Sequence, residues 1–135
     1  MAVDRKIWIL IADEAPEARR ILRETLEELY FEHIEEAADG EDAWDQLTQG
    51  HFGLVLCEWL LPRRSGLDLL EAMQADENLR STPLVLVTTE SDAETVQKAV
   101  AEGAAGFVVK PFDHFTLGEQ LEEAFIRQAN LFPFQ

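Results

Sequence analysis

The sequence has little positive charge, a single cysteine and no long hydrophobic run. It contains 11 Lys and Arg against 27 Asp and Glu, which gives a formal net charge of −16. A chain this acidic repels phosphate backbones and anionic lipids, so we expect neither nucleic-acid binding nor membrane docking. A lone cysteine, Cys57, excludes an internal disulfide, and its apolar neighbours predict a small buried side chain. There is no pattern of a signal peptide or spanning helix, and we expect a cytoplasmic protein.

Two common kinds of ligand site are also missing. There is no Gly-x-Gly-x-x-Gly or Walker pattern to cradle a phosphate, and His33, His51 and His114 lack the spacing of metal ligands. What remains is a chain of 135 residues that is 47% hydrophobic, which suits one domain with an ordinary core. We predict a single domain over residues 1–128 and an apolar tail over residues 129–135.

Short β-rich runs alternate with helical patterns along the chain. Strands are predicted at Lys6–Ala12, His33–Ala37, Gly53–Cys57, Pro83–Thr88 and Ala105–Val109. Helices are predicted after each strand, the first over Glu17–Tyr30. Their expected start signals are Pro16 in the first turn of the first helix, Asp39 before the second, capping boxes at Ser65 with Asp68 and Ser91 with Glu94, and Asp113 or Thr116 before the last. Five strand–helix units in series predict a parallel sheet with helices on both faces.

Chemically active side chains stand where the predicted strands end. Asp13 and Glu14 follow the first strand, Glu58 follows the third, Thr88 closes the fourth and Lys110 follows the fifth. Ligands of open parallel sheets bind beyond the carboxyl ends of the strands, so we expect these side chains to converge. Clustered carboxylates need a cation, and oxygen ligands at a wet edge suit Mg²⁺. With Lys110 neutralising further charge and Thr88 donating a hydrogen bond, the edge would bind a phosphoryl group.

Short motifs at and between these strand ends extend the pattern over residues 6–125. They are Ala12-Asp13-Glu14, Glu58-Trp59-Leu60-Leu61-Pro62, Gly66-Leu67-Asp68-Leu69-Leu70, Val87-Thr88 and Gly106-Phe107-Val108-Val109-Lys110-Pro111-Phe112. With them the chain resembles the receiver domains of bacterial response regulators, and the single-domain chemotaxis receivers in particular. The resemblance implies a flavodoxin-like (βα)5 doubly wound sheet with strand order 2-1-3-4-5. It also implies a protein-interaction switch in a two-component phosphorelay, not an enzyme.

The resemblance further implies a role for each residue at this edge. Weakly bound Mg²⁺ would be held by Asp13, Glu14, Glu58 and the backbone carbonyl of Leu60. Glu58 stands at the phosphoacceptor position, Thr88 matches the switch hydroxyl, and Phe107 matches the aromatic rotamer switch. Lys110 matches the phosphoryl-contacting lysine, and the Lys110–Pro111 bond is one that is often cis in the family.

Glu58 is a departure from the family pattern, in which an aspartate is phosphorylated. An acyl phosphate on Glu58 would lie one methylene, on the order of 1 Å, farther from the strand, and a displacement of that size can cost about 10²-fold in rate. We therefore expect normal phosphorylation to be lost. The glutamate is either native, which makes this a pseudo-receiver, or an engineered change in an ordinary receiver. The sequence leaves open whether Glu58 imitates the active or the inactive state.

The resemblance implies protein partners at two surfaces. A histidine kinase or histidine phosphotransfer protein would dock near the first helix and the Trp59–Leu61 loop, where Arg19, Arg20, Arg63 and Arg64 lie nearby in sequence. A downstream effector would bind the last two helices and the fifth strand. The cognate kinase, the effector, the pathway and whether the chain belongs to a longer protein stay open, as does the choice between a monomer and a weak homodimer.

Two other functions are compatible with the same layers of strands and helices. A flavin-mononucleotide carrier would need a loop rich in Ser, Thr and Gly after the first strand, whereas Asp13 and Glu14 would repel its phosphate. A phosphatase with an aspartyl intermediate would need an Asp nucleophile and a second Asp two residues later. Glu58 and Leu60 fill neither role.

Overall fold

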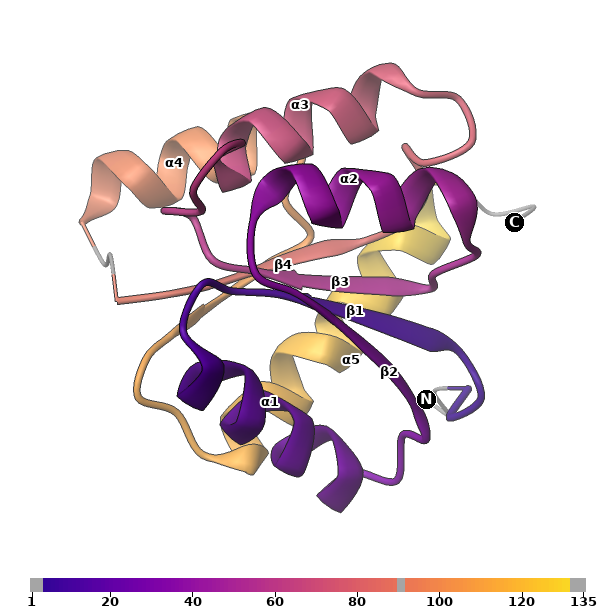
Figure 1. Ribbon diagram of the computed structural model, residues 1–135, viewed down its shortest axis with the longest axis vertical. Helices are drawn as coiled ribbons and strands as arrows, with labels where there is room; N and C mark the ends of the chain where they lie inside the picture. Colours follow the sequence, from indigo (N-terminus) through magenta and orange to yellow (C-terminus); the bar gives the residue numbers. More distant parts are fainter. Residues whose placement is uncertain (1–3, 90–91, 132–135) are drawn as a thin grey trace.

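A five-stranded parallel sheet lies between two layers of helices in the computed structural model, which describes residues 4–89 and 92–131 (Figure 1). The elements are β1 (Trp8–Ala12), α1 (Pro16–Glu28), β2 (His33–Ala37), α2 (Gly40–Gln49), β3 (Leu54–Cys57), α3 (Gly66–Ala75), β4 (Leu84–Thr88), α4 (Ala93–Ala101), β5 (Gly106–Val109) and α5 (His114–Leu131). All neighbouring strands pair in parallel, in the order β2-β1-β3-β4-β5. The predicted fold class and strand order are confirmed.

Most helix starts follow the predicted signals, with one correction. Asp39 and Ser65 cap α2 and α3 by accepting hydrogen bonds from the backbone N–H groups of Asp42 and Asp68. The capping box predicted at Ser91 and Glu94 is wrong, because Asp92 caps α4 through the Thr95 N–H; Ser91 itself lies outside the described residues.

The last helix has the start signal of one predicted alternative and a later end than expected. Asp113 Oδ1 accepts a hydrogen bond from the Thr116 N–H at 2.7 Å, and α5 begins at the next residue, His114. The helix continues through Leu131, so residues 129–131 of the predicted tail are helical, and residues 132–135 lie outside the described residues. The domain boundary at residue 128 stays a prediction.

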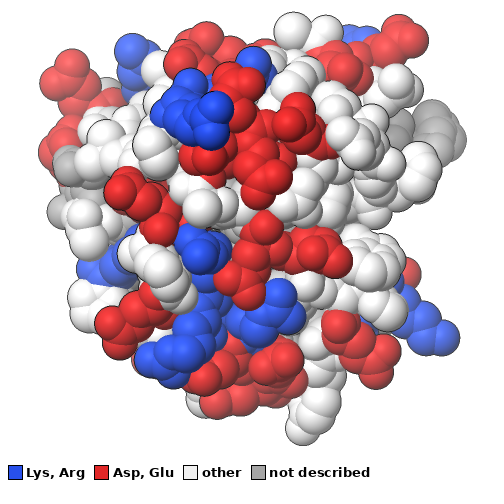
Figure 2. All heavy atoms as spheres, viewed as in Figure 1, with Lys and Arg blue, Asp and Glu red and all other residues white. Residues whose placement is uncertain are grey.

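The surface carries the excess of acid that the composition demands. On the face shown in Figure 2, acidic side chains are spread over the whole view, whereas a group of basic side chains lies over α1. That helix contains three arginines, Arg19, Arg20 and Arg23, and each contacts at least one glutamate. Arginine side chains are therefore concentrated on the helix that follows the loop after β1, where glutamates balance their charge.

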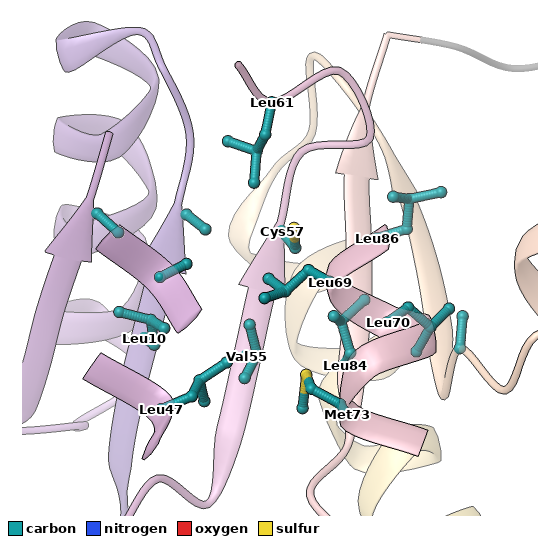
Figure 3. Packing of buried hydrophobic residues seen from close by; sticks show 14 of the residues in the cluster. Leu10, Leu47, Val55, Cys57, Leu61, Leu69, Leu70, Met73, Leu84 and Leu86 are labelled. Carbon is teal, nitrogen blue, oxygen red and sulfur yellow. The ribbon is translucent and has the colours of Figure 1, made fainter. Parts of the chain in front are cut away.

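The core has two halves, one on each face of the sheet. Strand residues alternate between them: Leu10, Val55 and Leu84 pack with α2, α3 and α4, whereas the residues beside them in the sequence pack with α1 and α5. Figure 3 shows the first half, in which side chains from the strands meet those of α2 and α3. Because both faces are covered, the central strands β3 and β4 are apolar along their length, which is why they were readable as continuous runs, whereas the edge strand β2 carries Glu35 and Glu36. Cys57 is buried, as predicted.

Candidate functional site

Three site residues, each directly after the last residue of a strand, still form backbone hydrogen bonds with the neighbouring strand, and these bonds fix their positions. The Asp13 N–H donates to Ala37 O at 3.0 Å, and the Glu58 N–H donates to Ala12 O at 2.9 Å. In the same way the Lys110 N–H donates to a carbonyl of β4, at 2.9 Å. The chain directions of parallel strands agree, so the three side chains leave the sheet at the same carboxyl-end edge.

The side chains of four predicted site residues meet there. Lys110 Nζ lies 2.6 Å from Asp13 Oδ2 and 3.6 Å from Glu58 Oε2. Thr88 Oγ1, which is fully buried, donates a hydrogen bond to Glu58 Oε1 at 3.1 Å. The second oxygen of Asp13, Oδ1, accepts from the Ala15 N–H at 2.9 Å. A cation and a hydroxyl thus hold two carboxylates from different strands.

Glu58 has an unbalanced environment. Its side chain is only 12% exposed, and Oε2 is buried without a hydrogen-bond partner among the described residues. Burial raises the pKa of the Glu58 carboxyl, and the charge of Asp13 acts in the same direction; together they outweigh Lys110 and Thr88, which lower it. An oxygen atom of this kind is available to a further positive or hydrogen-bonding group.

The remaining predicted residues lie in the loops after β1 and β3 and on β5. The side chain of Glu14 is exposed, and so is Leu60, whose backbone carbonyl was the predicted ligand. Phe107 on β5 is partly buried and packs against the first half of the core. The Lys110–Pro111 peptide bond is cis, as the family resemblance implied.

The donor atoms bear on whether Mg²⁺ fits. Within residues 4–89 and 92–131, three or more acidic, histidine or cysteine side chains are nowhere gathered into a ready-made metal cluster. Mg²⁺, however, often uses only one or two carboxylates and keeps several waters. Asp13 and Glu58 already share one cation, Lys110, and Glu58 Oε2 has unused acceptor capacity. The residues therefore fit a weakly held Mg²⁺ for which the Lys110 ammonium competes.

Comparisons with known proteins agree with this geometry. Residues 9–122 match the family model described as the response regulator receiver domain. The chain belongs to the response regulator receiver domain family. It is 37% identical over 125 residues to the chemotaxis protein CheY-3 of Vibrio cholerae, covering 93% of this chain and 96% of that one. It is 39% identical over 119 residues to the chemotaxis protein CheY of Pseudomonas aeruginosa, covering 88% and 96%.

A solved structure extends the comparison of this receiver domain to three dimensions. The chemotaxis response regulator CheY4 of Vibrio cholerae superposes with a TM-score of 0.81 at 28% identity, over 88% of this chain and 98% of that one. CheY-like receiver domains are signalling switches that interact with kinases and effectors, and they typically bind Mg²⁺ at their acidic pocket. In the part of this chain that the structure describes, no helix has the length and apolar character of a membrane span.

Sequence reasoning missed two residues that contact the loops of the candidate site in this receiver domain. Arg19 was noted only as a basic residue near a docking surface, yet its guanidinium contacts the loop that carries Asp13. Gly66 was noted only as part of a motif, yet a Cβ there would lie 2.6 Å from Glu58 O. Arg19 could have been singled out from its position in α1. Residues three apart lie on the same face of a helix, and Leu22, three residues after Arg19, is buried.

Proposed function

We propose that this receiver domain switches without an aspartyl phosphate, with Glu58 standing at the phosphoacceptor position. The observation that carries the proposal is the 3.1 Å hydrogen bond from Thr88 Oγ1 to Glu58 Oε1. In the family resemblance Thr88 is the hydroxyl that moves toward a phosphoryl group. Here a carboxylate that extends one methylene beyond that of an aspartate already occupies the hydroxyl's hydrogen bond.

The same contacts disfavour phosphorylation of Glu58. One of its oxygens accepts from Thr88, and the other is buried 3.6 Å from the Lys110 ammonium. An attacking carboxylate oxygen must be accessible and correctly placed; Oε2 is buried, and a misplacement of about 1 Å can lower the rate of phosphoryl transfer about 10²-fold. The glutamate therefore serves as a fixed negative charge in place of a transferred phosphoryl group.

On this proposal, Glu58 holds Thr88 and Lys110 as a phosphoryl group would, and so imitates the active state of the switch, which is called the engaged state below. A carboxylate is an anion that Thr88 and Lys110 contact together, as they would contact a phosphoryl group. Phe107 supports this interpretation because it is partly buried against the core and not extended into solvent. Mg²⁺ would be bound weakly by Asp13, Glu14, Glu58 and the Leu60 carbonyl. It would neutralise the negative charge of the carboxylates that Lys110 alone leaves unmatched.

The engaged state would be transmitted to protein partners. An effector would bind the surface of α4, β5 and α5, where Val100 and Val109 expose 57% and 39% of their area. A histidine kinase or histidine phosphotransfer protein would still dock near α1 and the loop after β3, without transferring a phosphoryl group. On this proposal the chain is a pseudo-receiver that acts by contact.

The proposal is tested with acetyl phosphate and Mg²⁺ on the wild-type protein and on Glu58→Asp. We expect intact-mass spectrometry to detect no adduct on the wild type and a base-labile phosphoryl adduct on the aspartate variant. Glu58→Gln, which keeps the length and removes the charge, is the matched control and should loosen the Thr88 contact without permitting an adduct. A phosphoryl adduct on Glu58 of the wild-type protein would refute the proposal.

A further inference from the structure

The guanidinium of Arg19 lies beneath the loop that joins β1 to α1. Its Nη1 atom donates to the carbonyl oxygens of Asp13 at 2.7 Å and of Glu14 at 3.1 Å. Asp13 belongs to the candidate site, and Glu14 is the predicted metal ligand that follows it in the loop. One side chain thus satisfies two successive carbonyls that would otherwise face solvent or each other.

Arg19 is itself held by the edge strand. Its Nε donates to Glu36 Oε1 on β2 at 2.9 Å, and its side chain is only 17% exposed. The other oxygen of Glu36 accepts from Arg23 Nε at 2.7 Å, and the Glu36 carbonyl accepts from Gln46 at 2.9 Å. Arg23 and Gln46 therefore hold Glu36, which presents its other carboxylate oxygen to Arg19.

The neighbouring residue provides a natural contrast. Arg20 is 57% exposed, and among the described residues its ion pairs are with Glu24 and Glu17 of its own helix. Exposed pairs of this kind contribute little. The two arginines have the same chemistry and nearly the same position in the chain, and they differ in what they touch.

We infer that Arg19 is a positioning residue of the receiver site, which holds the Asp13–Glu14 loop in its ligand-binding geometry and is aimed by Glu36. The part of the inference that is measured by Mg²⁺ binding rests on the proposed function. The part that is measured by the order of the loop backbone does not. It goes beyond the residues that contact the metal or the phosphoryl group, since Arg19 acts only through the loop backbone.

The two possible roles of Arg19, as a nearby positive charge and as a positioning residue, predict opposite changes in Mg²⁺ affinity when its guanidinium is removed. Loss of a positive charge near a cation site should tighten Mg²⁺ binding by simple electrostatics. Loss of a group that orients the ligands should weaken binding, by about 10- to 100-fold for partners of this type. The sign of the change therefore separates a positioning role from a mere contribution to the local field.

The experiment follows MgCl₂ titrations by nuclear magnetic resonance, using backbone amide signals and the indole N–H of Trp59. We expect Arg19→Gln to weaken Mg²⁺ binding by about tenfold or more, and Glu36→Gln to weaken it in the same direction by less. Arg20→Gln is the matched control and should change it by no more than about twofold. Arg19→Lys, which keeps the charge and loses the fork, should behave like Arg19→Gln.

A second readout does not depend on metal. The Ala15 N–H donates to Asp13 Oδ1, so its hydrogen exchange reports on the loop. We expect faster exchange at Ala15 in Arg19→Gln and in Arg19→Lys, and wild-type exchange in Arg20→Gln. If wild-type protein shows no Mg²⁺ response, the metal part of the proposed function fails, and the exchange result alone decides the role of Arg19.

Two results would overturn the inference. Tighter Mg²⁺ binding in Arg19→Gln would assign Arg19 to the local field. If Arg19→Gln unfolds at a lower urea concentration but keeps wild-type exchange at Ala15, Arg19 contributes to global stability and does not position the loop. Should Arg19→Gln fail to fold, the Ala15 exchange in Glu36→Gln carries the test, because loss of the Glu36 charge would weaken Mg²⁺ binding by electrostatics alone.

Discussion

The ammonium of Lys110 is bonded to Asp13 across 97 residues of sequence, with Nζ 2.6 Å from Oδ2, and lies 3.6 Å from Glu58 Oε2. It is therefore an internal counter-ion for carboxylates that follow β1 and β3. A cation taken from solution would have to compete with Lys110 for the same oxygens. The strength of the Lys110 contacts would therefore set how tightly the proposed Mg²⁺ is held.

Replacing Lys110 by Met should tighten Mg²⁺ binding by about tenfold or more, because two neighbouring carboxylates then lack their counter-ion. The same change should lower the free energy of unfolding in metal-free buffer by about 2–3 kcal/mol, less than for a fully buried pair because Lys110 is 21% exposed. Urea unfolding with and without MgCl₂ measures both effects. Lys98→Met, an exposed change on α4, is the control; equal behaviour of the two variants would mean that Lys110 is not the competing cation.

Replacing Thr88 by Val should remove the donor to Glu58 Oε1 at almost constant volume. A buried acceptor that loses its partner costs about 1–3 kcal/mol, and since Thr88 lowers the pKa of Glu58, that pKa should rise further. Urea unfolding and a carbon-13 titration of the Glu58 carboxyl measure the two effects. The exposed neighbour Thr89, changed to Val, should affect neither. A Glu58 titration that is the same in both variants would show that the Thr88 bond is not formed in solution.

The sheet and the convergence of the site were accessible from sequence because both follow from the parallel topology. Continuous apolar runs such as Leu54–Cys57 identify strands buried on both faces, and side chains that follow parallel strands must meet at one edge. The order of the strands came from the family resemblance. Nothing in the periodicity alone would have put β2 at the sheet's edge.

The missed features depend on choices between chemically equivalent neighbours. Ser91 with Glu94 and Asp92 with Thr95 have the same spacing, and serine and aspartate cap helices about equally well, so pattern alone does not select Asp92. Arg19 and Arg20 likewise differ only in which way the helix turns them. Such choices are made by tertiary contacts, here by Glu36 from β2.

Gly66 should tolerate no side chain, because a Cβ there would lie 2.6 Å from Glu58 O and 2.9 Å from Trp59 Cα. Gly66→Ala is expected to cost about 1–3 kcal/mol of unfolding free energy and to displace the loop after β3. Urea unfolding and the Trp59 indole signal measure the change. Gly118→Ala, inside α5, is the matched control, because a Cβ there would lie an ordinary 3.7 Å from the Leu29 side chain. It should be neutral or stabilising by up to about 1 kcal/mol. A stable Gly66→Ala protein with an unchanged indole signal would contradict the close approach.

The Glu36 carboxylate should make stability depend on pH on the acidic side. Desolvation raises its pKa, but the hydrogen bonds and charges of Arg23 and Arg19 outweigh that effect, so the pKa lies below its ordinary value of 4.5. A depressed pKa means that the unfolded state binds the proton more readily, so the stabilisation is present above pH 4.5 and is lost as the pH falls through the folded-state pKa. Because Glu36 is 31% exposed, its contribution is expected to be only about 1 kcal/mol.

Glu36→Gln should therefore lower the free energy of unfolding at neutral pH and converge with the wild type well below pH 4.5. Urea unfolding across that range measures the difference. Glu35→Gln changes the exposed neighbour on the same strand and should leave the acid limb of the wild-type curve intact. If the Glu36→Gln and wild-type curves stay parallel through the acid range, the arginine contacts of Glu36 do not contribute to folding in solution. Convergence in that variant alone would identify this one carboxylate, held between two arginines, as a source of the acid sensitivity.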